Sequence, residues 1–333
     1  MASHNVGIIG CGVIGARRAE ILKKFPAAKL VKVADINPER AKALAEQNKC
    51  AHTTDWHEVT QDPQISQVIV STTNNLLAEA TIDAIKHGKH VLVEKPAARN
   101  LDELNKVIAA YESLAKKPVL KAGFNHRFHP AFQKAKEIIA TQGIGEIMFI
   151  RARYGHGARV GYDKEWRSKK EVSGGGELLD QGVHVIDLAR YFMGDFERAV
   201  GHCETFFWKN GEVEDNCFAL MKTPKGQIAS FHVSTTQWKN IFSMEIFCKT
   251  GQINIDGLGK SYGKETLTFY KMKPEMGPPD KEVYDWEGDD SWEKEYADFI
   301  SAIEQNKEPN GTIYDVRAAL KLVSEIYSKP KLL

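Results

Sequence analysis

The stretch Val6-Gly7-Ile8-Ile9-Gly10-Cys11-Gly12-Val13-Ile14-Gly15 decides the fold of this chain. A short apolar run leads into three glycines spaced as G-x-G-x-x-G, and a segment with helical periodicity follows. In a turn that binds a dinucleotide, the first glycine makes the tight bend, the second admits the pyrophosphate, and the third lets the helix pack on the strand. This context predicts a dinucleotide cofactor bound by Gly10, Gly12, Val13, Ile14 and Gly15, with its phosphates at the helix N-terminus.

The next apolar run, Leu30–Ala34, is followed by Asp35, about twenty residues after the last glycine of the turn. A carboxylate at this place accepts hydrogen bonds from the adenosine ribose hydroxyls and repels a 2′-phosphate. The nearest cation, Arg40, is expected on the solvent face of the following helix. The sequence therefore favours NAD as the cofactor, with NADP as the weaker alternative.

The first part of the chain, residues 1–124, alternates short β-rich runs with amphipathic segments. The expected strands are Val6–Ile9, Leu30–Ala34, Val68–Ser71, His90–Glu94 and Val119–Phe124, and the expected helices are Ala16–Lys24, Pro38–Gln47, Leu77–His87 and Leu101–Lys116. Alternation of this kind predicts an α/β domain, a Rossmann fold with a doubly wound parallel sheet.

Residues 125–333 follow a different pattern. A helix over 131–141, a strand over 146–154 and a Gly-rich, charged loop lead to a helix from about Gly176 to Met193, which Gly194 ends. Several β-rich runs and two closing helices, 292–306 and 313–328, come next. We expect an α+β domain with a large, mostly antiparallel open sheet, one face covered by helices and the other free for a homodimer or homotetramer contact.

The composition excludes several classes of protein. The net charge is +1 and 42% of the residues are hydrophobic, so nothing indicates binding to nucleic acid or to an anionic membrane. No apolar run approaches the roughly 20 residues needed to cross a bilayer. The 333 residues exceed the size at which one core usually stops growing, which favours two domains.

The five cysteines are scattered, odd in number and without C-x-x-C spacing. This usage is typical of reduced thiols and predicts a cytoplasmic protein without a disulfide framework. His126, His129 and His156 lack the spacing and the carboxylate neighbours of a metal site, so no metal is expected.

A candidate for acid–base chemistry lies in Gly175-Gly176-Glu177-Leu178-Leu179-Asp180-Gln181-Gly182-Val183-His184. Residues four apart on a helix share one face, so Asp180 and His184 would present a carboxylate and an imidazole together. An imidazole titrates near neutral pH and suits the proton transfer that accompanies hydride transfer.

A second candidate, Lys95, follows the expected strand His90–Glu94 at the carboxyl edge of the sheet, where ligands bind in open α/β folds. The next residue, Pro96, fixes the chain direction and is a candidate for a cis peptide bond. Other polar residues at this edge are expected to contact the cofactor, namely Thr72, Thr73, Asn74, Glu94 and Lys95 itself.

Three motifs follow the glycine turn in order: Glu94-Lys95-Pro96, Gly123-Phe124-Asn125-His126-Arg127-Phe128-His129-Pro130, and Gly174-Gly175-Gly176 with Asp180, His184 and Asp187. Together they resemble the glucose–fructose oxidoreductase/inositol dehydrogenase/MocA (Gfo/Idh/MocA) family over essentially the whole chain. The resemblance implies oxidation of a secondary alcohol of a sugar or cyclic polyol, or reduction of the matching ketone, with a nicotinamide cofactor.

By the same resemblance, the family's catalytic lysine corresponds to Lys95 and its Asp-x-x-x-His pair to Asp180 and His184. His184 would act as general base in oxidation and general acid in reduction. Lys95 would donate a hydrogen bond to the developing alkoxide. Asp180 would bind a neighbouring substrate hydroxyl or hold the other two in register.

Aromatic and cationic residues flank the expected catalytic helix and suit stacking on a sugar ring or pairing with phosphate. A nucleotide-linked sugar therefore stays among the expected substrates. Besides the catalytic residues, the candidates for substrate contact are Asn125, Arg127, Arg153, Tyr154, Trp166 and Arg167.

Two alternatives to a sugar dehydrogenase remain open. Relatives of this family hydrolyse glycosides by a transient oxidation with NAD, and a third possibility is a sensor that binds NAD and a sugar without turnover. A sensor has no need of a proton relay, so Lys95, Asp180 and His184 together speak against it.

Overall fold

The computed structural model describes residues 4–328, which form two compact units. The first unit holds the chain up to Phe124 together with Glu171–Gly174 and Trp292–Arg317, and the second holds the rest. The expectation of one continuous second domain over 125–333 is corrected by this division. The reason is physical, because a helix near the C-terminus completes the core of the first unit.

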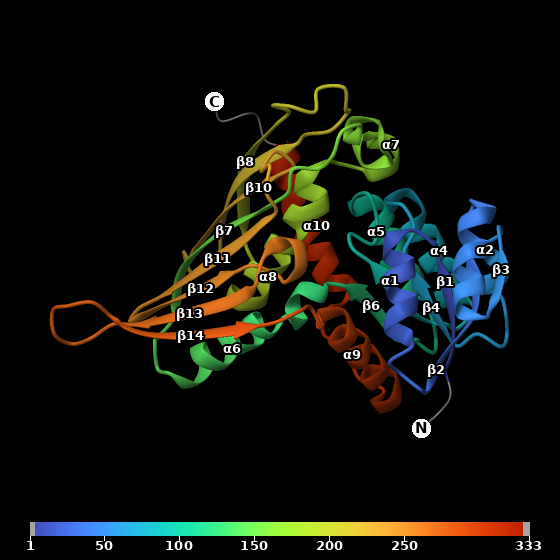
Figure 1. Cartoon of the computed structure of the whole chain (residues 1–333), viewed down its shortest axis with the longest axis horizontal. Coiled ribbons are helices and arrows are strands. Elements are labelled where there is room, and N and C mark those ends of the chain that lie inside the picture. Colours follow the sequence, from blue (N-terminus) through green and yellow to red (C-terminus); the bar gives the residue numbers. More distant parts are fainter. Residues whose placement is uncertain (1–3, 329–333) are drawn as a thin grey trace. The chain divides into compact units, whose positions relative to one another are not determined.

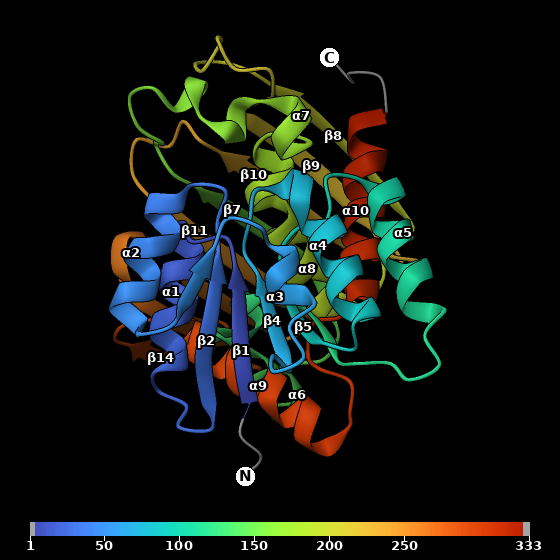
Figure 2. The ribbon, with the colours of Figure 1, turned by 90° about the vertical axis from the view of Figure 1, so that its right-hand side faces the viewer.

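The sheet of the first unit is doubly wound and entirely parallel, as predicted. Its strands lie in the order β3-β2-β1-β4-β5-β6, and each neighbouring pair is parallel (Figure 2). They span β1 His4–Ile9, β2 Ala28–Ala34, β3 Ala51–Thr53, β4 Gln67–Val70, β5 His90–Glu94 and β6 Leu120–Gly123. Only the short edge strand β3 gave no sequence signal.

Five helices connect these strands: α1 Val13–Leu22, α2 Pro38–Asn48, α3 His57–Thr60, α4 Asn74–Lys86 and α5 Leu101–Glu112. The side chain of Asn37 accepts hydrogen bonds from the N–H groups of Glu39 and Arg40, which caps α2. Helices α1 and α4 begin three residues earlier than expected. Their first turns lie beside the loops at the sheet edge, so those residues do not continue the apolar stripe that marks the helix.

Helix α9, Ser291–Gln305, supplies part of the core of the first unit. Tyr296, Phe299 and Ala302 pack in one cluster with β1 residues such as Val6 and Ile8. The Tyr296 hydroxyl also donates a hydrogen bond of 2.8 Å to Oε1 of Gln67. These contacts explain why Trp292–Arg317 belongs to this unit although it comes late in the sequence.

A buried ion cluster joins three elements of the first unit. The guanidinium of Arg18 on α1 lies 2.5 Å from Oε1 of Glu94 and 2.6 Å from Oε2 of Glu295 on α9. Burial raises the pKa of the Glu295 carboxyl, and the charge of Arg18 opposes this rise. The Trp292 ring packs against Arg18, with its centroid 4.4 Å from Cζ. The end of β5, where Lys95 follows, is thereby tied to α1 and α9.

The second unit is built on an eight-stranded sheet in the order β14-β13-β12-β11-β7-β10-β9-β8 (Figure 1). Only β7 and β10 pair in parallel, so the predicted mostly antiparallel sheet is confirmed. The strands span β7 Ile147–Gly155, β8 Arg198–Glu204, β9 Asn216–Lys222, β10 Ile228–Ser234, β11 Ile241–Cys248, β12 Gly251–Asp256, β13 Glu265–Lys271 and β14 Asp280–Trp286.

Strands β13 and β14 were missed in the sequence, where Lys271–Lys281 reads as a surface loop. The two ends of that range lie in these strands, and the loop between them projects beyond the sheet (Figure 1). Edge strand β14 consists mostly of charged and exposed residues, as suits a strand that must not pair with another chain.

Helices lie on one face of this sheet. Helix α6, Pro130–Thr141, packs on β12, β13 and β14, and helix α8, Val183–Met193, packs on β7 (Figure 1). The chain closes with α10, Ile313–Ser328. Large apolar side chains that remain exposed on the sheet strands are Met148, Phe218, Leu220, Ile228 and Val283.

Replacing Arg18 by Met tests the ion cluster. The variant keeps the apolar stem but leaves Glu94 and Glu295 buried without their cation, so we expect a loss of about 3–5 kcal/mol in the free energy of unfolding. The measurement is chemical denaturation. Lys23→Met on the same helix removes only the exposed pair with Glu20 and should change stability by less than about 0.5 kcal/mol. Equal effects of the two variants would contradict the role of the cluster.

Candidate functional site

The loops at the carboxyl edge of the parallel sheet bring the expected cofactor contacts together. Strands β1, β4 and β5 are consecutive neighbours and run in the same direction. The residues that follow them, Gly10–Gly12, Ser71–Asn74 and Glu94–Lys95, therefore lie along one edge at strand spacings of about 5 Å. This is the edge at which doubly wound folds bind ligands.

The three glycines of the turn serve different purposes. Gly10 has φ +97°, and a Cβ there would lie 2.4 Å from the Ser71 carbonyl oxygen. A Cβ on Gly15 would lie 1.8 Å from the Gly10 carbonyl oxygen. These two glycines are required by packing within the protein. A Cβ on Gly12 would have no heavy atom within 4 Å, so this position borders open space.

The start of α1 fits the phosphates of a dinucleotide. Gly12 is the N-cap of this helix, and no side chain caps it. The first N–H groups of a helix carry partial positive charge and need acceptors, which an anion can supply. Bare N–H groups beside open space at Gly12 are the arrangement that a bound pyrophosphate requires.

Asp35 holds the glycine turn in place from the end of β2. One carboxylate oxygen accepts a hydrogen bond from the Cys11 N–H at 2.7 Å, and the other accepts one from the Asn37 N–H at 2.8 Å. A carboxylate oxygen has two lone pairs, so Asp35 keeps acceptor capacity for a ribose hydroxyl. Arg40 lies exposed on α2, as expected.

The polar residues after β4 use their side chains locally. Thr72 donates to the Thr73 carbonyl oxygen at 3.0 Å, and Thr73 donates to the Asn75 side chain at 2.7 Å. Asn74 is buried and donates to the Ser173 carbonyl oxygen at 2.8 Å. These side chains fix the shape of the edge.

Glu94 and Lys95 differ in their surroundings. The Glu94 side chain is buried and engaged by Arg18, which gives it a structural task. Lys95 is half-buried beyond the strand end, and the Lys95–Pro96 peptide bond is cis, as predicted.

The expected helix over 176–193 is not one regular α-helix. Leu178–Gly182 forms a π-helical turn that contains Asp180, and α8 follows with His184 in its first turn. Glu214 holds the start of this turn in place. Its carboxylate accepts hydrogen bonds from the N–H groups of Gly176 and Leu178, both at 3.1 Å. Single π turns inside helices are often found at functional sites.

His184 is 4% exposed and stacks on His126, with ring centroids 3.9 Å apart and an interplanar angle of 22°. His126 lies in a 3-10 turn, Asn125–Phe128. Its Nε2 is 3.1 Å from the Tyr154 hydroxyl, and its Nδ1 is 3.1 Å from Oδ1 of Asn125. This stack could not be predicted from the sequence, although His126 lies inside one of the three motifs.

Asp180 lies among aromatic side chains and one cation. Its Oδ2 accepts a hydrogen bond from Nε of Arg167 at 3.2 Å, and the Arg167 guanidinium lies 4.5 Å from the Trp166 ring centroid. Burial and the nearby Asp180 carboxylate raise the pKa of the Tyr162 hydroxyl. Burial and contact with Tyr262 raise the pKa of the Tyr154 hydroxyl. These phenols stay protonated at neutral pH and can donate hydrogen bonds.

The second unit thus gathers five of the expected residues, Tyr154, Trp166, Arg167, Asp180 and His184. It adds Tyr162, one of the aromatic residues expected in the loop before the catalytic helix, and two residues that the sequence reasoning missed, His126 and Tyr262. Tyr262 comes from the connection between β12 and β13, with its ring centroid 5.4 Å from that of Tyr154. Only the fold brings this late segment to β7.

The structure places the other expected substrate contacts outside the cluster around Asp180. Arg127 is buried and makes two hydrogen bonds to the Asp187 carboxylate, at 2.8 and 2.5 Å, so it serves packing. Arg153 is exposed and, as the neighbour of Tyr154 on β7, points to the opposite face of the sheet. Asn125 is buried and donates to the Ser291 hydroxyl at 3.0 Å.

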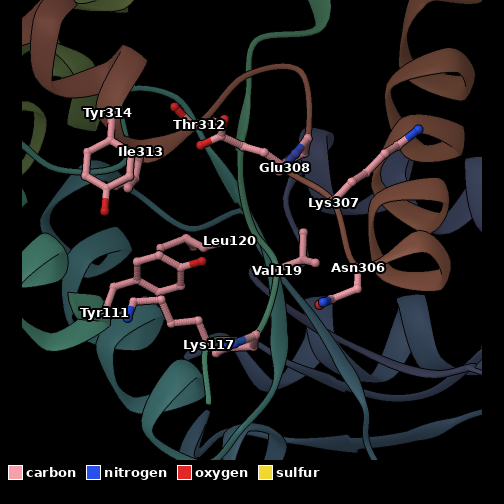
Figure 3. A pocket seen from close by; sticks show the side chains of 12 residues that line it. Tyr111, Lys117, Val119, Leu120, Asn306, Lys307, Glu308, Thr312, Ile313 and Tyr314 are labelled. Atoms are coloured by element: carbon pink, nitrogen blue, oxygen red, sulfur yellow. The ribbon is translucent and has the colours of Figure 1, made fainter. Parts of the chain in front are cut away.

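A pocket of about 210 Å³ in the first unit lies at the other end of β6 (Figure 3). Val119 and Leu120 at the strand start line it, together with Tyr111 and Tyr314. This places it at the edge of the sheet opposite to Gly123 and the cofactor loops, so it is separate from them.

Within residues 4–328, no helix is both long and apolar enough to span a bilayer. The same described residues contain no group of three or more His, Cys, Asp or Glu side chains arranged to hold a metal ion.

Comparison with known proteins agrees with both units. A model of the oxidoreductase family with an NAD-binding Rossmann fold matches residues 4–121, and a model of the GFO/IDH/MocA C-terminal domain matches residues 132–254. The 1,5-anhydro-D-fructose reductase of Ensifer adhaerens is 30% identical over 92% of this chain and 90% of that protein. The chain belongs to the Gfo/Idh/MocA family of oxidoreductases.

Other members of the family match over shorter stretches. Levoglucosan dehydrogenase of Pseudarthrobacter phenanthrenivorans is 36% identical over 59% of this chain and 53% of its own length. Myo-inositol 2-dehydrogenase of Thermotoga maritima is 33% identical over 57% of this chain and 55% of its own length. The chain spans about half the length of these curated relatives.

Among solved structures, levoglucosan dehydrogenase in complex with NADH and levoglucosan superposes with a TM-score of 0.87. The two chains are 25% identical, and the match covers 98% of this chain and 96% of that one. The fold of this family member therefore extends over both units.

Replacing Gly12 by Ala tests whether the open space beside the turn receives the pyrophosphate. Gly12 has φ −73°, which alanine adopts freely, so the free energy of unfolding should change by less than about 0.5 kcal/mol. The added methyl group should nevertheless weaken NADH binding at least about tenfold, since it fills the space for the phosphates. Fluorescence titration with NADH and chemical denaturation measure the two effects.

Gly15→Ala provides the contrast. Its Cβ would clash with the Gly10 carbonyl oxygen, so both stability and NADH binding should fall. Unchanged NADH binding by the Gly12→Ala variant would show that the cofactor lies elsewhere.

Proposed function

We propose that this chain is an NAD-dependent oxidoreductase that transfers a hydride between the nicotinamide and a secondary alcohol, or the matching ketone, of a sugar, cyclic polyol or nucleotide-linked sugar. The cluster around His184 carries this proposal. It combines an imidazole, the Asp180 carboxylate and several phenol hydroxyls in one unit of a family member whose other unit has an NAD-binding fold.

His184 is the proposed acid–base group. Removing a hydride from a C–H bond requires the hydroxyl proton to leave as well, and a neutral imidazole accepts it. The stack on His126 restricts rotation of the ring, and the hydrogen bond between His126 and Tyr154 holds that stack in turn. The imidazole is thus held in one orientation before substrate arrives. The nicotinamide, when bound, supplies the hydride acceptor or donor.

Lys95 and Asp180 have supporting roles in this proposal. The Lys95 ammonium would donate a hydrogen bond to the oxygen that gains negative charge as the alcohol proton leaves, which lowers the barrier. Asp180 would accept a hydrogen bond from a neighbouring substrate hydroxyl. Its Oδ2 accepts a hydrogen bond from Arg167, and a carboxylate offers about four lone-pair sites in all.

A polyhydroxylated ring is the substrate class that the site favours. Tyr154, Tyr162 and Tyr262 offer hydroxyl groups together with ring faces, and carbohydrate rings use both kinds of contact. The relatives above are named for levoglucosan, myo-inositol and 1,5-anhydro-D-fructose, which are compounds of this class. The positive charge of Arg167 would favour a substrate with an anionic group, such as the phosphate of a nucleotide sugar.

The choice of NAD over NADP rests on Asp35. Its carboxylate stands at the end of β2 and is fixed by two backbone N–H groups, so it cannot turn away from a 2′-phosphate. No cation accompanies it in Ile36-Asn37-Pro38, and Arg40 lies on exposed α2.

A spectrophotometric screen at about 340 nm tests the proposed function. Sugars, inositols and nucleotide sugars are each incubated with NAD and with NADP, and we expect reduction of NAD by at least one of them. Cleavage of a glycoside without net NADH would instead indicate the hydrolase alternative. Binding of a sugar without either reaction would indicate a sensor, and turnover with NADP alone would contradict the role of Asp35.

With a substrate from that screen, His184→Ala should lower kcat by about 10²–10⁴-fold while NADH binding stays intact, since general acid–base catalysis contributes this much. His87→Ala, a change of an exposed histidine at the end of α4, is the matched control and should leave turnover unchanged. If the His184 variant kept more than about a tenth of the wild-type rate, the general-base role would be wrong.

We also propose that the chain forms a homodimer or homotetramer through the uncovered face of the large sheet. On this face, neighbouring strands carry the exposed apolar side chains Phe218 and Leu220 of β9 and Ile228 of β10, and Phe218 stacks on His232 at 4.0 Å. Burying such a face in a contact between identical chains removes its apolar surface from water.

Light scattering on the intact protein should give the mass of two or four chains. Leu220→Lys places a charge in the proposed interface and should shift the mass toward one chain. Lys222→Leu on the same strand face is not expected to lower the mass. A wild-type mass of one chain of 37.3 kDa would refute the proposal.

A further inference from the structure

Two cysteines of the second unit stand directly opposite each other on neighbouring strands. Cys203 on β8 is paired in register with Cys217 on β9, and their sulfur atoms are 2.6 Å apart. Facing residues on antiparallel strands have Cα atoms about 4.5–5.5 Å apart, which lies within the range of about 4.4–6.8 Å that disulfides span. Of the remaining cysteines, Cys11 and Cys248 are buried and Cys50 is partly buried.

The two thiols differ in accessibility. Cys217 is buried, while Cys203 is partly exposed. The hydrogen bond from Cys203 and burial both raise the pKa of the Cys217 thiol, so Cys217 stays protonated. A small oxidant would therefore meet Cys203 first, with Cys217 as the resolving thiol beside it.

The pair closes the connection between β8 and β9, and this connection supports the candidate site. The Asp215 carboxylate accepts hydrogen bonds from the N–H groups of Phe206, Phe207 and Trp208. The neighbouring Glu214 accepts hydrogen bonds from the backbone at the start of the π turn that carries Asp180. Its Oε1 also accepts a hydrogen bond from the Tyr327 hydroxyl at 2.6 Å.

The same connection reaches the loop with Trp166 and Arg167. The Glu212 N–H donates to the Ser168 carbonyl oxygen at 2.8 Å, and the Glu212 carboxylate accepts from the Lys170 N–H at 2.9 Å. A covalent link at its base would therefore restrain two of the segments that form the cluster around His184.

We propose that Cys203 and Cys217 are a site of reversible oxidation, at which hydrogen peroxide converts the two thiols into a disulfide. The Cys203 thiolate attacks one peroxide oxygen, which breaks the O–O bond and gives a sulfenic acid and, after proton uptake, water. The Cys217 sulfur then displaces the sulfenic oxygen as a second water molecule. The sulfurs lose two electrons, and the peroxide gains them.

The disulfide joins residues 14 positions apart and so closes the whole β8–β9 connection. A link of this kind restricts the unfolded chain more than the folded one, so oxidation raises the melting temperature. Reduction by dithiothreitol reverses the rise. This inference does not depend on which reaction the enzyme catalyses.

The experiment treats the full chain with hydrogen peroxide, unfolds it in denaturant, labels free thiols and counts the labels by mass spectrometry. We expect the count to fall from five to three, with a dithiothreitol-sensitive peptide pair that contains Cys203 and Cys217. Cys203→Ser and Cys217→Ala should lose this pair and the rise in melting temperature. Cys50→Ser, the matched control, should keep both.

Five labelled thiols after treatment would overturn the inference, as would a sulfinic acid on Cys203 or a disulfide between two chains. The wild-type peptide pair decides the matter even if one of the variants fails to fold.

Discussion

The buried contact of Arg18 with Glu94 and Glu295 is the interaction on which the first unit depends. An arginine on the helix that follows the glycine turn is neutralised by one carboxylate at the end of β5 and another on α9. A buried charge is tolerated only with such partners, so the three elements are fixed together. The glycine turn and Lys95 are both attached to this cluster by a few covalent bonds, and their positions follow from it.

A second carboxylate, that of the partly buried Glu214, has a comparable structural role in the other unit. Glu214 accepts hydrogen bonds from the backbone at the start of the π turn and from the Tyr327 hydroxyl, although burial raises the pKa of this carboxyl. The turn holds Asp180, and α8 begins directly after it with His184 near its start. In both units, the residues proposed for chemistry stand next to a carboxylate that has a structural role.

The parallel sheet could be predicted because buried parallel strands are read as continuous apolar runs, such as Val68–Ser71. An amphipathic pattern, in contrast, shows that a helix buries one face but not against which sheet, so the place of α9 was missed. Strand β14 was missed because an edge strand may be charged throughout. The buried pair of Arg127 and Asp187 was equally invisible, since the partners lie 60 positions apart.

The side of the sheet on which Arg153 lies follows from the sequence itself. Arg153 and Tyr154 are adjacent in a predicted strand, and adjacent strand residues face opposite sides, so both could not contact one substrate. Asp180 and His184 were found because the motif carries them, and Tyr162 because it stands in the aromatic and cationic loop before the catalytic helix. Tyr262 was missed because it comes from a loop whose course only the fold defines.

The contribution of α9 to the first core also sets the order in which the chain can fold. During synthesis, β1 and its neighbours leave the ribosome long before Tyr296 and Phe299, which cover Val6 and Ile8. Until then that side of the nascent sheet exposes apolar surface to water. A fragment that ends at Phe124 would keep the nucleotide turn but lack this cover, and the apolar side chains beneath α9 would face water.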